Sequence, residues 1–176
     1  MRIGTIWGLI GCLALATGLA AWEQEAAKPS TDEVAALKTE VARLRGLVPD
    51  QSHAMSDVGY HFTNLWFAGE QSNWPLAQFY SDEVRSHLRW AVRIIPKRKD
   101  AEGREIDLGG ILGGLETSTL KDLAEAVKAK DKERFVAAYK GQLEACMACH
   151  RATNKPFLRL HLPEKSEATI VEFKPE

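Results

Sequence analysis

The feature that most constrains the fold is a helical spacing of apolar residues that recurs along most of the chain. Apolar residues are three or four positions apart in four stretches, at about 52–68, 74–95, 118–127 and 131–152. This spacing puts them on one face of an α-helix, whereas a half-buried strand would alternate at every second residue. Pro75 suits a first helical turn and Pro96 ends the second stretch. The spacing therefore predicts an all-α fold.

The connections between these stretches favour a bundle. The segment from Lys97 to Gly114 is charged and then rich in glycine, and we expect it to be a crossover loop. Helices of roughly 15 to 20 residues with short joins and one longer connection are typical of four-helix bundles. We expect an antiparallel four-helix bundle over residues 51–160. Phe157 to Leu162 alternates apolar and polar residues, so the chain should be extended there and continue as a tail over residues 161–176.

The N-terminal residues 1–21 predict export. Met1-Arg2 is positively charged, and Ile3 to Ala21 is uncharged and mostly apolar. The small residues around Gly18 suit cleavage of a signal peptide, whereas the length also suits an uncleaved membrane anchor. Lipidation at Cys12 is a third alternative. All three place the rest of the chain in the periplasm, either soluble or anchored to the inner membrane.

Residues 22–50 read as a linker followed by a short heptad helix. Ser30 and Glu33 have the spacing of a capping box. An apolar heptad seam follows at Val34, Leu37, Val41, Leu44 and Val48. The seam lasts about two heptads, fewer than a secure coiled coil needs. We expect an amphipathic helix that either lies on its own domain or forms the seam of a homodimer.

A cysteine and histidine motif lies near the end of the last helical stretch, as Cys146-Met147-Ala148-Cys149-His150. Two cysteines separated by two residues and followed by histidine form the c-type haem attachment pattern. Positions i, i+3 and i+4 share one helix face, so both sulfurs and the imidazole can meet one porphyrin. We predict one haem c per chain, attached through Cys146 and Cys149, with His150 as the proximal iron ligand.

Other chemistries explain the motif less well. A zinc site needs about four ligands, and His161, the nearest further candidate, lies beyond two helix breakers. A redox dithiol favours a helix N-terminus, where the dipole lowers the thiol pKa, whereas this pair lies near a helix end. The chain has only three cysteines, and Cys12 lies in the apolar N-terminus, so a disulfide framework is excluded.

On this motif and its position, the chain resembles the class II c-type cytochromes, the cytochrome c-prime type. The resemblance covers about Ser52 to Thr153 in architecture, but only Cys146 to His150 as a specific motif. It implies a four-helix bundle with the haem attached near the C-terminal end of the fourth helix. The family usually carries a basic residue four positions after the ligand histidine, whereas here Asn154 stands there and Lys155 follows it.

The resemblance also implies that the first bundle helix lines the distal face of the haem. His61 lies beside the apolar stripe of that helix, where it either ligates the iron, hydrogen-bonds a bound gas or is a boundary histidine bonded to Asp57. The other candidates for the distal ligand are Met55, His53 and His87. The residues expected to line the pocket are Phe62, Leu65, Trp66 and Tyr139.

These features favour a one-electron carrier with redox proteins as partners. The alternative is a haem protein that binds nitric oxide or carbon monoxide at an open distal site. A peroxidase would need an ordered acid/base pair above the iron, and His61 is the only such group on offer, so we do not expect an enzyme. The net charge of −1 gives no reason to expect nucleic acid as a partner.

Overall fold

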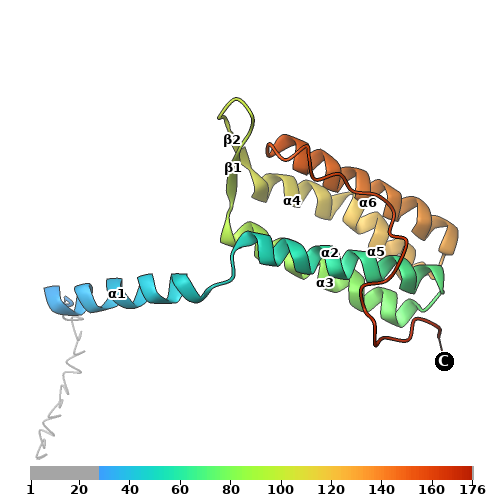
Figure 1. Cartoon of the computed structure of the whole chain (residues 1–176), viewed down its shortest axis with the longest axis horizontal. Helices are drawn as coiled ribbons and strands as arrows, with labels where there is room; N and C mark the ends of the chain where they lie inside the picture. Colours follow the sequence, from blue (N-terminus) through green and yellow to red (C-terminus); the bar gives the residue numbers. More distant parts are fainter. Residues whose placement is uncertain (1–27, 176) are drawn as a thin grey trace, which may run out of the picture. The chain divides into compact units, whose positions relative to one another are not determined.

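The computed structural model describes residues 28–175, so the predicted signal peptide or anchor and Cys12 lie outside the described residues. The chain divides into two compact units, residues 1–43 and 44–176. Figure 1 gives the order of the helices and strands along the chain. Within residues 28–175, no helix combines the length and the apolar composition needed to cross a membrane.

The predicted heptad helix is present as α1, Thr31–Leu47. Its capping box is formed as expected. The Ser30 backbone N–H donates to the Glu33 carboxylate at 2.7 Å, and the Glu33 N–H donates to the Ser30 hydroxyl at 3.2 Å. No residue of α1 is buried. Whether a second chain covers its apolar seam stays a prediction.

Two long helices begin the larger unit, α2 (Gln51–Glu70) and α3 (Trp74–Ile94). The Asp50 carboxylate caps α2 by accepting from the His53 N–H at 3.0 Å. The Asn73 side chain caps α3 by accepting from the Leu76 N–H at 3.3 Å. The two helices pack together along their length. Their predicted bounds are confirmed to within a few residues.

The segment that follows α3 differs from the predicted loop. It forms a two-stranded antiparallel hairpin, β1 (Lys97–Lys99) and β2 (Glu105–Asp107), and then a helix, α4 (Leu108–Thr117). Each glycine in α4 costs about 1 kcal/mol of helix propensity relative to alanine. The Asp107 carboxylate offsets part of this cost by accepting from the Gly109 N–H at 3.0 Å. Burial of Leu108 and Leu112 supplies the rest of the stabilisation.

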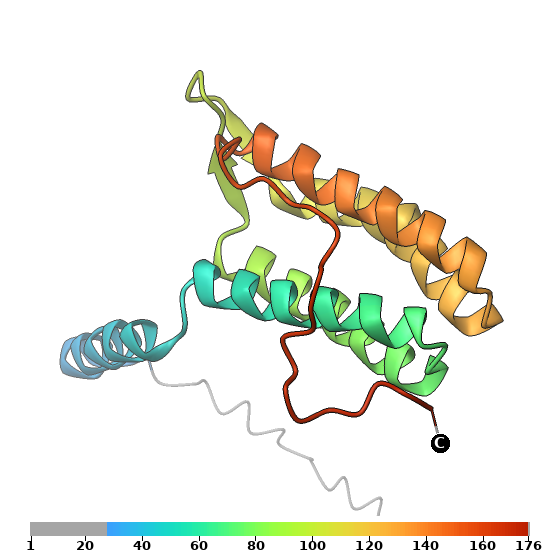
Figure 2. The same ribbon diagram turned by 45° about the vertical axis from the view of Figure 1, so that its right-hand side comes forward.

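The last two helices are α5 (Thr119–Ala129) and α6 (Lys132–Ala152). The predicted third helix is present as α5, and α4, which lies mostly in the predicted crossover loop, meets it at Ser118 because the Ser118 backbone (φ −128°, ψ −105°) is not helical. Figure 2 shows α2 and α3 on one side of this unit and α4, α5 and α6 on the other. The fold is all-α apart from the small hairpin.

An aromatic contact joins the two sides of the unit. The rings of Phe62 on α2 and Tyr139 on α6 are stacked with their centroids 4.2 Å apart. The Tyr139 hydroxyl donates to the Phe62 carbonyl at 2.9 Å. Leu65, Leu123 and Phe135 are fully buried in the same core. These contacts fix the rotation of α2 relative to α6.

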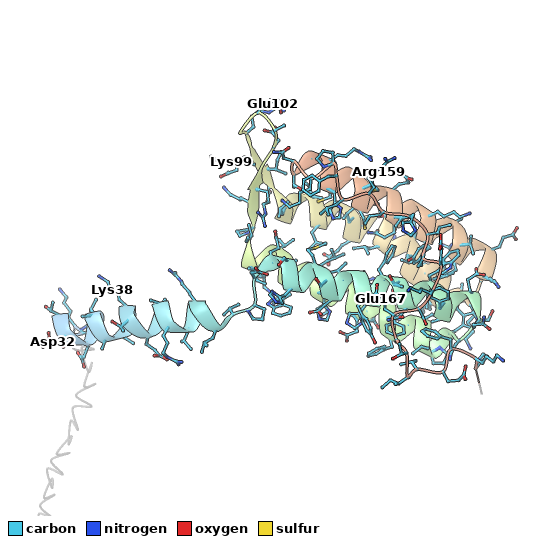
Figure 3. The ribbon with its side chains drawn as sticks, in the orientation of Figure 1. Asp32, Lys38, Lys99, Glu102, Arg159 and Glu167 are labelled. Atoms are coloured by element: carbon cyan, nitrogen blue, oxygen red, sulfur yellow. The ribbon has the colours of Figure 1, made fainter. Side chains whose placement is uncertain are left out.

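The C-terminal segment is extended, as expected, but it packs on the helices. Asn64 of α2 is fully buried, and its side-chain oxygen accepts from the backbone N–H groups of Glu167 and Ala168, both at 3.1 Å. Further along, the ring of Phe173 lies against Phe67 with centroids 6.1 Å apart. Figure 3 labels Glu167 where the segment passes α2. Residues 161–175 are thus a strap across the helical unit rather than a separate tail.

Candidate functional site

A cavity of about 490 Å³ lies at the end of the larger unit where α2 begins and α3 and α6 end, and we call it the end cavity. Its volume falls in the range of small-molecule and cofactor sites. Side chains from α2, α3, β1, α4 and α6 and from the segment 153–160 line it. Its apolar lining includes Leu88, Val92, Leu108, Ile111, Leu112 and Leu115.

The cysteine and histidine motif opens onto this cavity. Cys146, Cys149 and His150 all line it. The helix α6 is continuous to Ala152, so these three side chains share one face as their spacing requires. Both cysteines are free rather than joined in a disulfide. Two thiols and one imidazole therefore face a single apolar space.

The surroundings of the thiols argue against dithiol redox chemistry. Burial raises the pKa of Cys146 to about 11, and burial also raises the pKa of Cys149. The Gln142 side-chain amide donates to the Cys146 sulfur at 3.5 Å, which offsets part of this effect. Both thiols are thus protonated at neutral pH, whereas a redox dithiol needs a lowered thiol pKa.

The donor set of the end cavity fits a haem. The Nδ1 atom of His150 is buried and has no hydrogen-bond partner among the described residues. A buried polar group without a partner is uncommon, and contact with a bound group would account for it. A flat apolar group with a metal at its centre would use the whole lining, namely the thiols, the imidazole and the aliphatic walls.

Positive charge gathers at one edge of the end cavity. Arg98 of β1 and Lys155, which follows α6, line both this cavity and an adjoining hollow of about 460 Å³. Arg98 is held in place because its Nε donates to the Gln51 side-chain oxygen at 2.9 Å. Gln51 in turn donates to the Ala91 carbonyl at 2.8 Å. Lys155 stands one residue after the position at which the resembled family carries its basic residue.

Met55 is the α2 side chain in this cavity that carries a metal-ligand atom. It lines the same space as His150, together with Ser52 and Ser56. His53, one of the other candidates for the distal ligand, is exposed and lies 2.8 Å from the Asp50 carboxylate. The thioether of Met55 therefore enters the cavity from the helix expected to line its distal face.

His61 lies elsewhere. It is not among the residues that line the end cavity. Its Nε2 lies 3.9 Å from a Glu83 carboxylate oxygen, and its ring centroid is 4.8 Å from that of His87 on α3. Burial lowers the pKa of His61, so its imidazole is neutral at neutral pH. Asp57, expected as its partner, lies instead 3.8 Å from the His87 Nε2.

The predicted pocket residues also lie elsewhere. Phe62, Leu65, Trp66 and Tyr139 do not line the end cavity but belong to the aromatic and aliphatic core. The physical reason is that Phe62 and Tyr139 stack on each other and fill the space between α2 and α6. The open volume begins nearer the start of α2 and the end of α6, next to Met55 and Cys146.

The cavity wall that α4 contributes was not predicted from the sequence, because its glycines indicated a loop. Leu108, Ile111, Leu112 and Leu115 stand at positions i, i+3, i+4 and i+7. That spacing is the signature of an amphipathic helix and could have identified the wall.

Comparison of the chain with protein-family models, with curated proteins and with solved structures finds no match.

Proposed function

We propose that this chain is an exported monohaem c-type cytochrome of the class II type, with its helices arranged as an antiparallel four-helix bundle. The observation that carries the proposal is that Cys146, Cys149 and His150 line one apolar cavity of about 490 Å³. A chance occurrence of the motif has no reason to coincide with such a cavity. Zinc binding has less support, because no fourth Cys or His among residues 28–175 lines the same space.

The residues of the end cavity have distinct parts in this proposal. Cys146 and Cys149 would form thioethers to the haem, and His150 would be the proximal iron ligand. The aliphatic side chains of α3 and α4 would cover the porphyrin and keep water from it. When bound, the haem supplies one-electron chemistry, with a potential set by the axial ligands, burial and hydrogen bonds.

We assign the distal side to Met55 rather than to His61. Met55 lines the cavity and His61 does not. A thioether opposite a histidine is the ligand pair of electron-carrying cytochromes, and it raises the reduction potential. This placement favours electron transfer over the alternative of gas binding at an open iron. Redox proteins are the expected partners.

Arg98 and Lys155 would bind the haem propionates. Both side chains line the edge of the cavity, where the neighbouring hollow is also bordered by Lys97 and Lys99. A carboxylate near a guanidinium gains a charge-assisted hydrogen bond, which is about twice as strong as a neutral one. The apolar part of the haem and its acidic edge would then each have a matching surface.

Mass spectrometry of the denatured chain tests the proposal. Full-length protein is produced in a host that matures c-type cytochromes, and it should have the mass of the polypeptide plus one haem, because thioethers survive denaturation. The double variant Cys146→Ser/Cys149→Ser should have the bare polypeptide mass, while Cys12→Ser should not affect haem attachment. A wild-type chain without haem would refute the proposal.

A further inference from the structure

A second cluster of metal-ligand side chains lies between α2 and α3, and we call it the histidine cluster. It consists of His61 on α2 and of Glu83 and His87 on α3. Glu83 and His87 are four residues apart and so lie one above the other on the same helix face. One ligand atom from each of the three side chains lies within 4.8 Å of the other two.

The distances are close to those of a metal site. The Glu83 carboxylate oxygen lies 3.5 Å from the His87 Nδ1 and 3.9 Å from the His61 Nε2. Zn²⁺ binds nitrogen and oxygen at about 2.0 to 2.2 Å in a tetrahedron, so neighbouring ligand atoms are about 3.4 Å apart. The ligand atoms, which lie within 4.8 Å of one another, would therefore have to move closer by side-chain rotation to surround one ion.

The cluster is shielded from solvent without being sealed. The exposed fractions of the side chains are 15% for His61, 19% for His87 and 34% for Glu83. The Nδ1 of His61 is buried and has no hydrogen-bond partner among the described residues. Contacts among the described residues therefore leave this ring nitrogen without a partner.

Supporting groups surround His87 on both sides of its ring. The His87 Nδ1 donates to the backbone carbonyl of Glu83 at 2.9 Å, and its Nε2 lies 3.8 Å from the Asp57 carboxylate. If the Nδ1 binds a metal, it gives up its bond to the Glu83 carbonyl, and the Asp57 carboxylate remains 3.8 Å from the Nε2. A metal-bound histidine nearly always has such a partner, which fixes its orientation.

We propose that His61, Glu83 and His87 bind one Zn²⁺ per chain, with water completing the coordination. Two histidines and one glutamate form a known ligand set for zinc. The site is separate from the end cavity, because none of these three residues lines that cavity. It would link α2 to α3 and is independent of whether the chain carries haem.

Isothermal titration with Zn²⁺ tests the site on the full-length protein after treatment with a chelator. Wild type should bind one Zn²⁺ per chain. His61→Ala, His87→Ala and Glu83→Gln should each weaken binding at least about 100-fold, since even loss of an outer-shell partner costs about 10- to 100-fold. The exposed histidines supply matched controls, so His53→Ala and His161→Ala should bind as wild type does.

A second readout keeps the test decisive if an alanine variant folds poorly. Zn²⁺ should raise the melting temperature of wild type and of the Cys146→Ser/Cys149→Ser variant, but not that of His87→Gln. The cysteine variant separates this site from the haem and from free thiols. No saturable binding by wild type, or unchanged binding by both histidine variants, would overturn the proposal. So would a haem absorption spectrum altered in His61→Ala, because His61 would then be an iron ligand.

Discussion

The end cavity and the histidine cluster each contain a histidine and side chains of α2, yet the two environments differ. In the end cavity, His150 shares about 490 Å³ with aliphatic side chains and two thiols. In the histidine cluster, His61 lies among His87, Glu83 and aromatic rings, with ligand atoms within 4.8 Å of one another. The first suits a large apolar group, and the second suits one small ion.

The surroundings of each imidazole therefore determine which kind of ligand it can bind. Met55, His61 and Asn64 lie on different sides of α2, because each residue turns the helix by about 100°. Met55 lines the end cavity, His61 contacts α3, and Asn64 binds the strap. One helix thus contributes to two sites of different chemistry and to the strap contact that holds it in place.

The largest expected effect comes from His150. His150→Ala should remove the proximal ligand from an attached haem, because no other histidine lines the end cavity. We expect a large change in spin state, read from the absorption spectra of the oxidised and reduced protein. His161→Ala is the matched control and should leave both spectra unchanged. Equal spectra for wild type and His150→Ala would contradict the role of His150, since another residue would then be the proximal ligand.

Met55 and His61 provide the sharpest test of the distal side. Met55→Leu keeps the volume of the side chain but removes the sulfur, so a low-spin haem should become high-spin and bind carbon monoxide more tightly. His61→Ala should leave the spin state unchanged. If only His61→Ala converts the spin state, the distal ligand is His61 and not Met55. A high-spin wild type would instead favour gas binding over electron transfer.

The strap contact holds α2 in the orientation that turns Met55 to the end cavity and His61 to α3. Asn64→Ala removes a fully buried acceptor of two backbone N–H groups. Leaving a buried donor unpaired costs about 1 to 3 kcal/mol, so the free energy of unfolding should fall by about that amount in urea titration. Thr63→Ala loses only an exposed 3.3 Å contact with Glu167 and should change it by less than about 0.5 kcal/mol. Equal losses in the two variants would contradict this role.

The smallest effect is expected at the edge of the end cavity. Arg98→Gln removes a positive charge beside the proposed propionates, which disfavours the reduced haem and should lower the reduction potential by on the order of tens of millivolts. Lys97→Gln is the control, because Lys97 is exposed, pairs with Glu105 at 2.6 Å and does not line the cavity. Redox titration of both variants measures the difference. A larger shift for Lys97→Gln would place the acidic edge of the haem elsewhere.

The periodic helices were predictable because their signals are local. Apolar spacing, Pro75 and the caps at Ser30 and Asp131 all act within a few residues, and the structure has helices at these places. The prediction failed between Lys97 and Thr117, where glycines lower the helix propensity. There the packing of Leu108 and Leu112 outweighs propensity, and packing depends on partners far away in the sequence.

The sequence by itself determined the donor atoms of the motif from Cys146 to His150 and their spacing. Cys146, Cys149 and His150 share a face as soon as their segment is helical, because the spacing i, i+3 and i+4 is a property of the helix alone. Only the tertiary structure decided which side chains oppose them. His61 and Met55 are both close to the apolar stripe of α2. The stacking of Phe62 on Tyr139 sets the rotation of the helix and turns Met55 to the cavity and His61 to α3.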